Sequence, residues 1–208
     1  MRETPSYLLT DEEEVRRLVR EHPWATLVSA GPAGLVASHY PVVLDEDAPG
    51  IVLLSHVGRP DEVALGLGER ELMVVVQGPH GYVSPSWYPP GRIVPTWNHV
   101  TAHLYGTPEV LDPEENLAVL GRLVDRMEAP LPEGRSLALN PEHVRRLARG
   151  TVGMRLVVTR FEARRKLSQD KPAEVQRAVA ARLREPGPYA SPALAAEMER
   201  VQSAGGAR

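Results

Sequence analysis

The chain has 208 residues, of which 24 are basic and 27 acidic, so its formal net charge is -3 and its pI is near 6.2. This charge balance excludes a protein that coats nucleic acid nonspecifically. Because cysteine is absent, disulfides, thiolate metal sites and cysteine nucleophiles are excluded as well. The length fits one domain, or one domain with a small appendage, and allows a sizeable core.

No apolar run approaches the roughly 18 residues of a membrane-spanning helix. The first residues, MRETPSYLLTDEEE, carry acid where a signal peptide would carry an apolar region. We therefore expect a cytoplasmic protein with no membrane partner.

The first half of the chain reads as one helix followed by strands. Residues 11–21 are predicted to form an amphipathic helix, with Thr10 and Glu13 as its capping box. A short polar helix or turn is expected near residues 61–69. Hairpin-like separations favour antiparallel pairing of the four β-rich runs, which comprise residues 24–30, 35–44, 50–56 and 71–78.

The second half mixes strands with helices. A further strand is predicted at residues 100–111, and Asp112 opens a helix. The apolar residues of that helix recur at three- and four-residue steps: Leu117, Leu120, Leu123, Val124 and Met127. The remaining predictions are a short helix at residues 141–149, a strand at 151–161 that closes the sheet, and a polar helix at 171–184.

The last residues read as a peripheral tail that can fray, because Pro-Gly-Pro precedes one amphipathic segment and a small-residue end. We therefore divide the chain into a main domain, residues 1–184, and a C-terminal helical tail, residues 185–208. Six mostly antiparallel strands with helices at the ends predict an α+β barrel or a strongly bent sheet. A Rossmann arrangement is disfavoured, since no strand runs into a G-x-G-x-x-G turn.

The densest signal is the segment 76–105, which holds two of the three tryptophans, three tyrosines and three histidines. Aromatic side chains beside prolines build a flat and stiff recognition surface, for which a planar ring is a natural ligand. The alternative is a proline-rich loop packed on its own aromatics. Polar side chains interleave with the aromatics, which favours a binding site; they are Gln77, Ser84, Ser86, Thr96 and Asn98.

A second candidate site ends a predicted buried strand, in the segment LLSHVGRPD. Ser55, His56 and Arg59 around a permissive glycine can donate several hydrogen bonds to a phosphate. The alternative is an exposed strand end with a salt bridge from Arg59 to Asp61.

Three polar residues, Ser38, His39 and Tyr40, interrupt another apolar strand, so at least one of them must point toward the core. A core histidine bonded to a carbonyl is the first reading of His39. His99 and His103 are about 13 Å apart on a strand, too far to share one ion, so no metal site is predicted. No catalytic residue is assigned, since no serine lies in G-x-S-x-G.

The most basic run of the chain, residues 164–169, is predicted to follow the last strand. It contains Lys166, Ser168 and Gln169, and Lys166 and Lys171 are the only lysines of the chain. Such a run either holds an anion or solvates a strand end.

These motifs together, in this order, resemble one known family. They are HPWATLVS, ASHYPVVLD, SHVGRP, QGPHGYVSPSWY, VPTWNHVTAHLYG and RRKLSQD, and they span about residues 1–172. The series resembles the PaiB family of FMN-binding negative transcriptional regulators. GPHGYVSPSWY, VPTWN and KLSQ are its most specific parts.

The resemblance implies a split β-barrel related to pyridoxamine-phosphate-oxidase-like flavoproteins, with peripheral helices, in a homodimer that lodges FMN between its subunits. The implied phosphate ligands are Ser55, His56 and Arg59. The residues implied near the ribityl chain or ring are Ser38, His39 and Gln77. The implied walls of the isoalloxazine are Trp87, Trp97 and Asn98, and the implied contribution from the partner is Lys166 and Gln169. Asp170 and His99 stand where the family more usually has an amide or a tyrosine, and an acid at Asp170 would weaken anion binding nearby.

Three functions follow from the resemblance. The first is an FMN-binding transcriptional regulator with DNA as a partner, although the chain offers no recognition helix with a basic face. The second is an FMN-dependent oxidoreductase, in which the flavin performs the redox step. The third is a haem-binding split barrel that uses His39, His80 or His103 as axial ligand.

Overall fold

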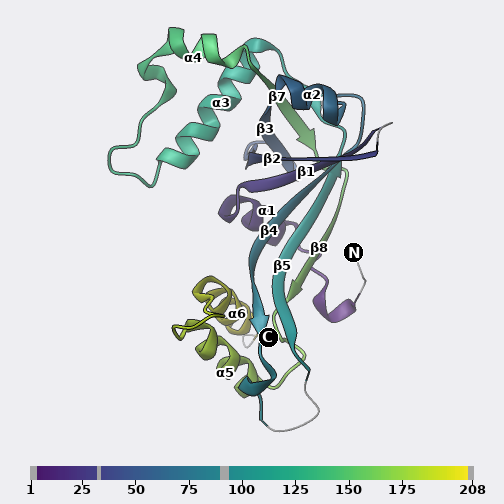
Figure 1. The fold of residues 1–208 in the computed structure, drawn as a ribbon, viewed down its shortest axis with the longest axis vertical. Helices are drawn as coiled ribbons and strands as arrows, with labels where there is room; N and C mark the ends of the chain where they lie inside the picture. The colour runs from purple at the N-terminus through teal and green to yellow at the C-terminus, as the bar shows by residue number, and fades with distance from the viewer. Residues whose placement is uncertain (1–3, 32–33, 90–93, 206–208) are drawn as a thin grey trace. The chain divides into compact units, whose positions relative to one another are not determined.

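The computed structural model describes residues 4–31, 34–89 and 94–205 (Figure 1). It consists of two compact units. Unit 1 comprises Met1–Thr10, Gln77–Thr101 and Glu162–Arg208, and unit 2 comprises Asp11–Val76 and Ala102–Phe161.

The described strands form one eight-stranded sheet in the order β6-β7-β3-β2-β1-β4-β5-β8. Their bounds are β1 Trp24–Gly31, β2 Gly34–Leu44, β3 Val52–Gly58, β4 Leu72–Val83, β5 Thr96–Gly106, β6 Glu109–Val110, β7 Thr151–Val157 and β8 Arg160–Lys166. The helices are α1 Glu12–Glu21, α2 Arg59–Leu65, α3 Pro113–Glu128, α4 Pro141–Ala148, α5 Ala173–Arg184 and α6 Pro192–Gly205. Three short 3₁₀ helices are η1 Pro5–Tyr7, η2 Pro85–Trp87 and η3 Leu137–Leu139.

Antiparallel pairing, as predicted, joins β1 to β2 and β4, β3 to β2 and β7, and β6 to β7. Leu27 faces Ser38 of β2 and Val74 of β4 across the ladder. Alternate residues of β1 and β4 are buried, the pattern of strands with one face toward a core. None of the helices in the described ranges combines the length and the apolar composition needed to cross a bilayer.

The structure describes eight strands where six were predicted, because two predicted strands are each divided. The segment predicted as one strand at 100–111 forms β5, which already begins at Thr96, and β6, with Thr107 and Pro108 between them. The segment 151–161, predicted as one strand, is divided by Val158 and Thr159 into β7 and β8. These two residues donate their amides to the carbonyls of Ile51 and Tyr105. Neighbouring residues of this segment therefore bond to different parts of the chain, and the strand is divided there although the local composition does not change. For the same reason the basic residues 164–166 lie within β8 rather than after the last strand.

Strand β4 also continues further than predicted, through Pro79 and His80 to Val83. The alternation of buried and exposed residues shifts by one position at these two residues, so that Gly81 and Val83 are buried like Val76. Proline and glycine within a strand resemble loop signals, so the sequence predicts a strand only as far as residue 78.

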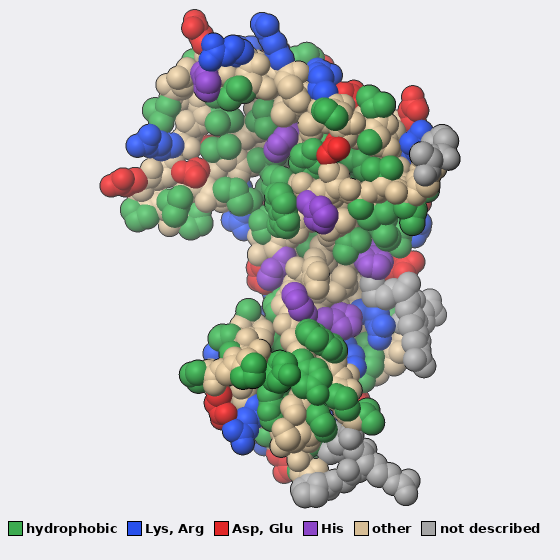
Figure 2. Space-filling view, in the orientation of Figure 1, with side chains coloured by type: hydrophobic (Ala, Val, Ile, Leu, Met, Phe, Trp, Pro, Cys, Tyr) green, Lys and Arg blue, Asp and Glu red, His purple; other side chains and the backbone are tan. Residues whose placement is uncertain are grey.

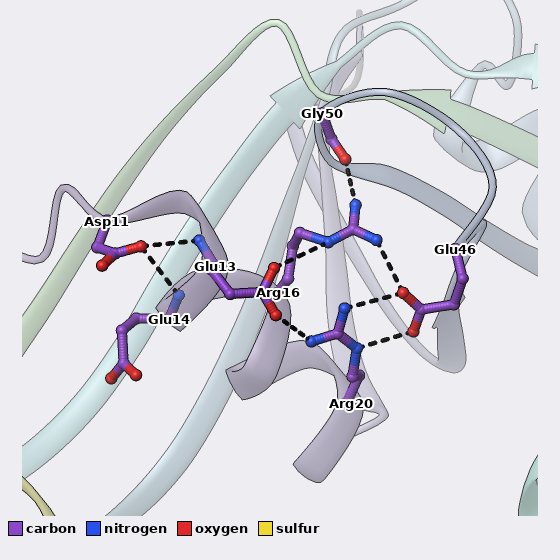
Figure 3. A network of polar contacts seen from close by, with 7 residues as sticks. All are labelled: Asp11, Glu13, Glu14, Arg16, Arg20, Glu46 and Gly50. Atoms are coloured by element: carbon purple, nitrogen blue, oxygen red, sulfur yellow. Dashed lines mark hydrogen bonds and ion pairs between the residues drawn. The ribbon is translucent and has the colours of Figure 1, made fainter.

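The N-cap of helix α1 is Asp11, one residue later than the predicted cap Thr10. The carboxylate of Asp11, rather than the hydroxyl of Thr10, accepts the amides of Glu13 and Glu14. Figure 3 shows how the helix is then attached to the turn between β2 and β3. Arg20 donates to both carboxylate oxygens of Glu46, and Arg16 bonds to Glu46 and to the carbonyl of Gly50.

Helix α3 covers one face of unit 2. Asp112 and Glu115 form a full capping box at its start, with Pro113 at the first helical position. Val119 and Leu123 pack with Leu54 of β3 in a buried cluster, against which Val43 and Leu111 also pack. The predicted helix is confirmed, but its predicted apolar face is not. Of the five residues predicted, only Leu123 is buried and Met127 is exposed, whereas Val119 is buried instead.

Helices α5 and α6 pack on each other in unit 1. Leu183 of α5 and Leu194 of α6 are fully buried, and both lie near the position that a Cβ at Gly81 would occupy. Met198 of α6 is buried as well. The segment expected to be a peripheral tail therefore contributes core residues, because its apolar face meets α5. The division of the chain at residue 184 stays a prediction.

Candidate functional site

Strand β2 and helix α2 bring a polar group together in unit 2. The hydroxyls of Ser38 and Tyr40 both donate to Oδ2 of Asp61, the latter at 2.6 Å. The amide of Gly58, at the end of β3, donates to the Tyr40 hydroxyl at 3.0 Å. These hydrogen bonds hold the pKa of the Asp61 carboxyl below its usual value, that from Ser38 most strongly. Asp61 is therefore ionised at neutral pH.

His56 completes this group, which we call the β2–α2 polar group and which consists of Ser38, Tyr40, His56 and Asp61. The His56 ring lies edge-on to Tyr40, with 5.8 Å between ring centroids. Its Nδ1 is buried and has no hydrogen-bond partner among the residues that the structure describes. A buried polar atom without a partner is uncommon, and a bound ligand, water or ion is among the explanations for one. Burial also lowers the pKa of His56.

The lowered pKa of His56 predicts that acid destabilises the protein. The unfolded chain binds this proton near pH 6.5 while the folded chain resists it, so stability contributed by neutral His56 is present above about pH 6.5 and is lost below it. We expect the free energy of unfolding, measured by urea denaturation, to fall from about pH 7.5 to about pH 5.5. His56→Gln should reduce this decrease. Equal pH slopes for the two proteins would contradict the prediction.

Ser55 and Arg59 lie at the end of β3 and the start of α2. Ser55 is fully buried, and its hydroxyl donates to the carbonyl of Pro41 at 2.6 Å. Arg59 donates Nε to the carbonyl of Arg149 at 2.8 Å and pairs with Glu62 at 3.3 Å, while its side chain remains 56% exposed. The alternative salt bridge from Arg59 to Asp61 is wrong, because Glu62 takes that place one turn along the helix.

His39 is exposed on β2, opposite Thr26 of β1. The interpretation of His39 as a core histidine is therefore wrong. Its neighbours Ser38 and Tyr40 turn to the half-buried side instead. Sequence reasoning did not assign Tyr40 or Asp61 to the site; the only signal was the hydroxyl pair two residues apart on one strand face.

The β2–α2 polar group fits the sugar-alcohol chain of FMN. Ser38 donates its proton to Asp61 but keeps its oxygen lone pairs, and Asp61 has a second carboxylate oxygen, so both can accept from ribityl hydroxyls. The Asp61 charge would oppose a phosphate at the same place. The phosphate is better placed at Arg59, whose terminal guanidinium nitrogens keep donor capacity.

The predicted aromatic residues lie in unit 1. Trp97 of β5 is 57% exposed, and Gln77 of β4 is exposed as well. Trp97 meets the ring of Tyr82 edge-on at 6.1 Å, and Tyr82 meets Tyr189 at 4.8 Å. Figure 2 shows hydrophobic side chains gathered over the part of the chain that carries α5 and α6. Trp97, Tyr82 and Tyr189 thus form an exposed aromatic surface, of which Tyr189 was not foreseen in the sequence.

Asn98 alternates with Trp97 on β5 and is fully buried. Its Nδ2 donates to Ser168 Oγ at 2.9 Å and contacts the sulfur of Met198 at 3.6 Å. Ser168 has φ of 61°, a left-handed conformation that is uncommon outside glycine. The side-chain amide of Asn98 therefore holds the turn at Ser168 and contacts helix α6 at Met198, both within unit 1.

Lys166 lines a hollow of about 230 Å³ in unit 1, which we call the lysine pocket. Its lining residues are Tyr7, Tyr88, Val94, Thr96, Lys166, Ser168, Asp170 and Lys171. Lys166 bonds to the hydroxyl of Thr96, and burial lowers the pKa of its amine. Asp170 forms a salt bridge with Lys171 at 2.9 Å, so its charge is neutralised locally. The pocket holds both lysines of the chain.

Gln169 and Trp87 are held by local structure. Gln169 donates to the carbonyl of Ser6 at 2.9 Å and to that of Arg165, and accepts the amide of Leu167. Trp87 is half-buried in η2. The structure thus brings the predicted residues into two groups, one in each unit, and their roles toward a flavin remain predictions.

Residues 1–160 match the model of the family described as "Putative FMN-binding domain". The chain belongs to this family. It is also 29% identical over 174 residues, 80% of this chain and 82% of the relative, to "Protease synthase and sporulation protein PAI 2" of Bacillus subtilis. An uncharacterized protein of Saccharomyces cerevisiae is 32% identical over 112 residues, which is 50% of this chain and 66% of that protein. The predicted PaiB relationship and the predicted flavin cofactor are confirmed at the level of the family.

Solved structures show the same fold. The FAD and heme binding protein from Mycobacterium smegmatis matches with a TM-score of 0.62 and 19% identity, over 81% of this chain and 78% of that one. The flavocytochrome Anf3 from Azotobacter vinelandii matches with a TM-score of 0.57 and 13% identity, over 76% and 69%. The predicted α+β class with an antiparallel split β-barrel and peripheral helices is confirmed.

Proposed function

We propose that the protein binds FMN through the β2–α2 polar group and Arg59, and that the holoprotein is a PaiB-type regulator. The observation that carries this proposal is the unpartnered, buried Nδ1 of His56 beside hydroxyl and carboxylate acceptors, in a chain of an FMN-binding family. Bound FMN would supply a redox-active ring and a dianionic phosphate; the protein residues hold and orient it.

Each polar residue has a separate task in this proposal. Arg59 donates to the phosphate, and its Nε contact with the Arg149 carbonyl fixes the direction of the guanidinium. Ser38 and Asp61 accept from ribityl hydroxyls. Tyr40 positions the turn after β3, because its oxygen accepts the Gly58 amide and its proton goes to Asp61. Nδ1 of His56 forms a hydrogen bond with a polar atom of the ligand. His39 and Ser55 are less suited to contact FMN. His39 is exposed, and the hydroxyl of Ser55 already donates to the carbonyl of Pro41.

A homodimer is part of the proposal. The exposed Trp97 and Tyr189, with the half-buried Tyr82 in contact with both rings, supply an aromatic surface that a second copy can cover. In the dimer the KLSQ segment of one copy contributes Lys166 to the flavin of the other. Sedimentation of the holoprotein as a monomer at micromolar concentration would refute this part of the proposal without affecting FMN binding.

The regulatory role is favoured by the similarity to the Bacillus subtilis protein PAI 2, whose name refers to protease synthesis and sporulation. An absorbance spectrum of the purified protein checks the cofactor, since flavin bands support the proposal and a Soret band would establish haem instead. A salt-dependent shift of promoter DNA would support regulation. Bleaching of the flavin bands by NADH or NADPH, without DNA binding, would identify an oxidoreductase.

Replacing Arg59 tests the phosphate assignment. Arg59→Ala removes a charge-assisted contact worth about 1.5–3 kcal/mol, so FMN affinity should fall by roughly 10- to 100-fold. Fluorescence quenching of FMN on titration measures this. Arg164→Ala is the matched control, because Arg164 lies in unit 1 at 5.8 Å from the Tyr7 ring and is not assigned to the phosphate. Riboflavin, which lacks the phosphate, should bind wild type and Arg59→Ala equally. Equal loss of FMN in both variants would refute the assignment.

A further inference from the structure

A second hollow lies in unit 2. None of the four residues of the β2–α2 polar group lines it, but Arg59, the proposed phosphate ligand, does. The volume of the hollow is about 350 Å³, at the lower end of the roughly 300–1,000 Å³ of small-molecule sites. We call it the arginine pocket, and residues of α2, β6, α3, α4 and β7 line it. Figure 2 shows basic side chains gathered with acidic ones over the region of α3 and α4.

The floor of the arginine pocket is apolar and rigid. Val110, Leu111, Leu117 and Val152 supply its hydrocarbon surface. Beside them Asn116 is buried, and its Nδ2 donates to the Thr151 hydroxyl at 3.1 Å. A ligand with an apolar body can therefore bury that body without rearranging the floor.

The rim carries three arginines and two glutamates. Arg145 pairs with Glu114 at 2.8 Å, and Arg59 pairs with Glu62 at 3.3 Å. Both carboxylates are thus already neutralised. The guanidinium of Arg149 has no hydrogen bond or ion pair to any of the residues that the structure describes. The rim therefore keeps one unsatisfied cation, while a second, Arg145, is held only by an exposed pair of the kind worth less than about 1 kcal/mol.

The end of α4 would normally repel an anion, because the last carbonyls of a helix carry partial negative charge. Here these carbonyls already accept hydrogen bonds. The Thr151 hydroxyl donates to Ala148 at 3.0 Å, Arg59 Nε donates to Arg149 at 2.8 Å, and the Arg59 amide donates to Gly150 at 3.1 Å. These hydrogen bonds weaken the repulsion at the place where the Arg149 side chain begins.

We infer that the arginine pocket binds a small organic carboxylate with an apolar body. The carboxylate bonds to Arg149, while Arg145 keeps its pair with Glu114. The apolar body lies against Val110, Leu117 and their neighbours. A cation is disfavoured, since both rim carboxylates are paired. An inorganic anion would leave the apolar floor unused. Because Arg59 also lines this pocket, the inference requires that FMN bound at Arg59 leaves Arg149 accessible. In the regulator proposed above, the pocket would receive a small-molecule signal.

Phenylacetate is a suitable probe, with phenylacetamide as its neutral counterpart. Isothermal titration of the full chain, saturated with FMN, is expected to show phenylacetate binding at least about 10-fold more tightly than phenylacetamide. Arg149→Ala should lower the affinity for phenylacetate by about 10-fold or more. Arg146→Ala is the matched control and should change it less than about 2-fold, because Arg146 on the same helix bonds to His143 and does not line the pocket.

Three results would overturn the inference: equal affinity of wild type and Arg149→Ala for phenylacetate, equal binding of acid and amide, or displacement of phenylacetate by FMN in flavin-free protein. The last result would make the pocket part of the flavin site. Absence of phenylacetate binding at millimolar concentration also contradicts the inference. None of these results bears on whether FMN binds, which the flavin spectrum and the Arg59→Ala titration decide separately.

Discussion

Gly153→Val is expected to destabilise the protein by about 3 kcal/mol, because the new side chain would occupy the space of helix α3. A Cβ at Gly153 of β7 would lie 2.9 Å from the Cα and 3.1 Å from the Cβ of Asn116. These are atoms of the helix backbone and of a buried side chain, so α3 itself must move away from the sheet. The midpoint of urea denaturation measures the loss.

The matched control lies in the helix that moves. Gly121 of α3 has nothing within 4 Å of its Cβ position, so Gly121→Ala adds no clash. Alanine favours a helix interior over glycine, and we expect a gain of about 0.5–1 kcal/mol. If Gly153→Val unfolds at the same urea concentration as wild type, the close approach of α3 to β7 is wrong. The floor of the arginine pocket would then be wrong with it.

Asn98→Asp is expected to cost about 3 kcal/mol or more at neutral pH, because it places a carboxylate without a cationic partner at a fully buried position. The amide of Asn98 donates to Ser168 at 2.9 Å, and a carboxylate cannot donate. Burial raises the pKa of the new carboxyl in the folded state, so the penalty is present above that raised pKa and decreases as pH falls through it. Urea denaturation at about pH 7.5 and about pH 5 measures both effects.

Asn140→Asp is the control for this substitution. Asn140 is exposed and caps α4 by accepting the amide of His143, a task that aspartate performs equally well. A change in the free energy of unfolding below about 0.5 kcal/mol is therefore expected.

The two substitutions also test the predicted contact of Asn98 with the isoalloxazine. Loss of FMN affinity in Asn98→Asp with unchanged stability would support that contact and contradict the structural role proposed for this residue.

Local signals account for most of the predicted elements. The helix at α3 followed from a capping sequence and apolar residues at helical spacing, both of which act over a few neighbouring residues. The strands β1, β2 and β3 followed from β-branched runs between turn signals. The split between β7 and β8 and the length of β4 were missed, because pairing partners far along the chain decide where a strand ends.

The candidate site was only partly predictable for the same reason. The sequence singled out His39 and Ser55, whereas the structure exposes His39 and commits the Ser55 hydroxyl to Pro41. It did not single out Asp61, whose hydrogen bond with Ser38 joins residues 23 positions apart. Of the arginine pocket the sequence singled out only Arg59, since its other rim residues, apart from Glu62, come from α3 and α4, far along the chain.

Composition and short stretches of sequence were sufficient for the charge, the absence of cysteine, the family and most element positions, because these depend on residues close together in the chain. Which polar atoms have partners depends on how distant segments pack. Asn98 and Ser168 are 70 residues apart, and the sequence around either residue does not show that the other is its hydrogen-bond partner. The unpartnered nitrogen of His56 is likewise a property of everything packed around it.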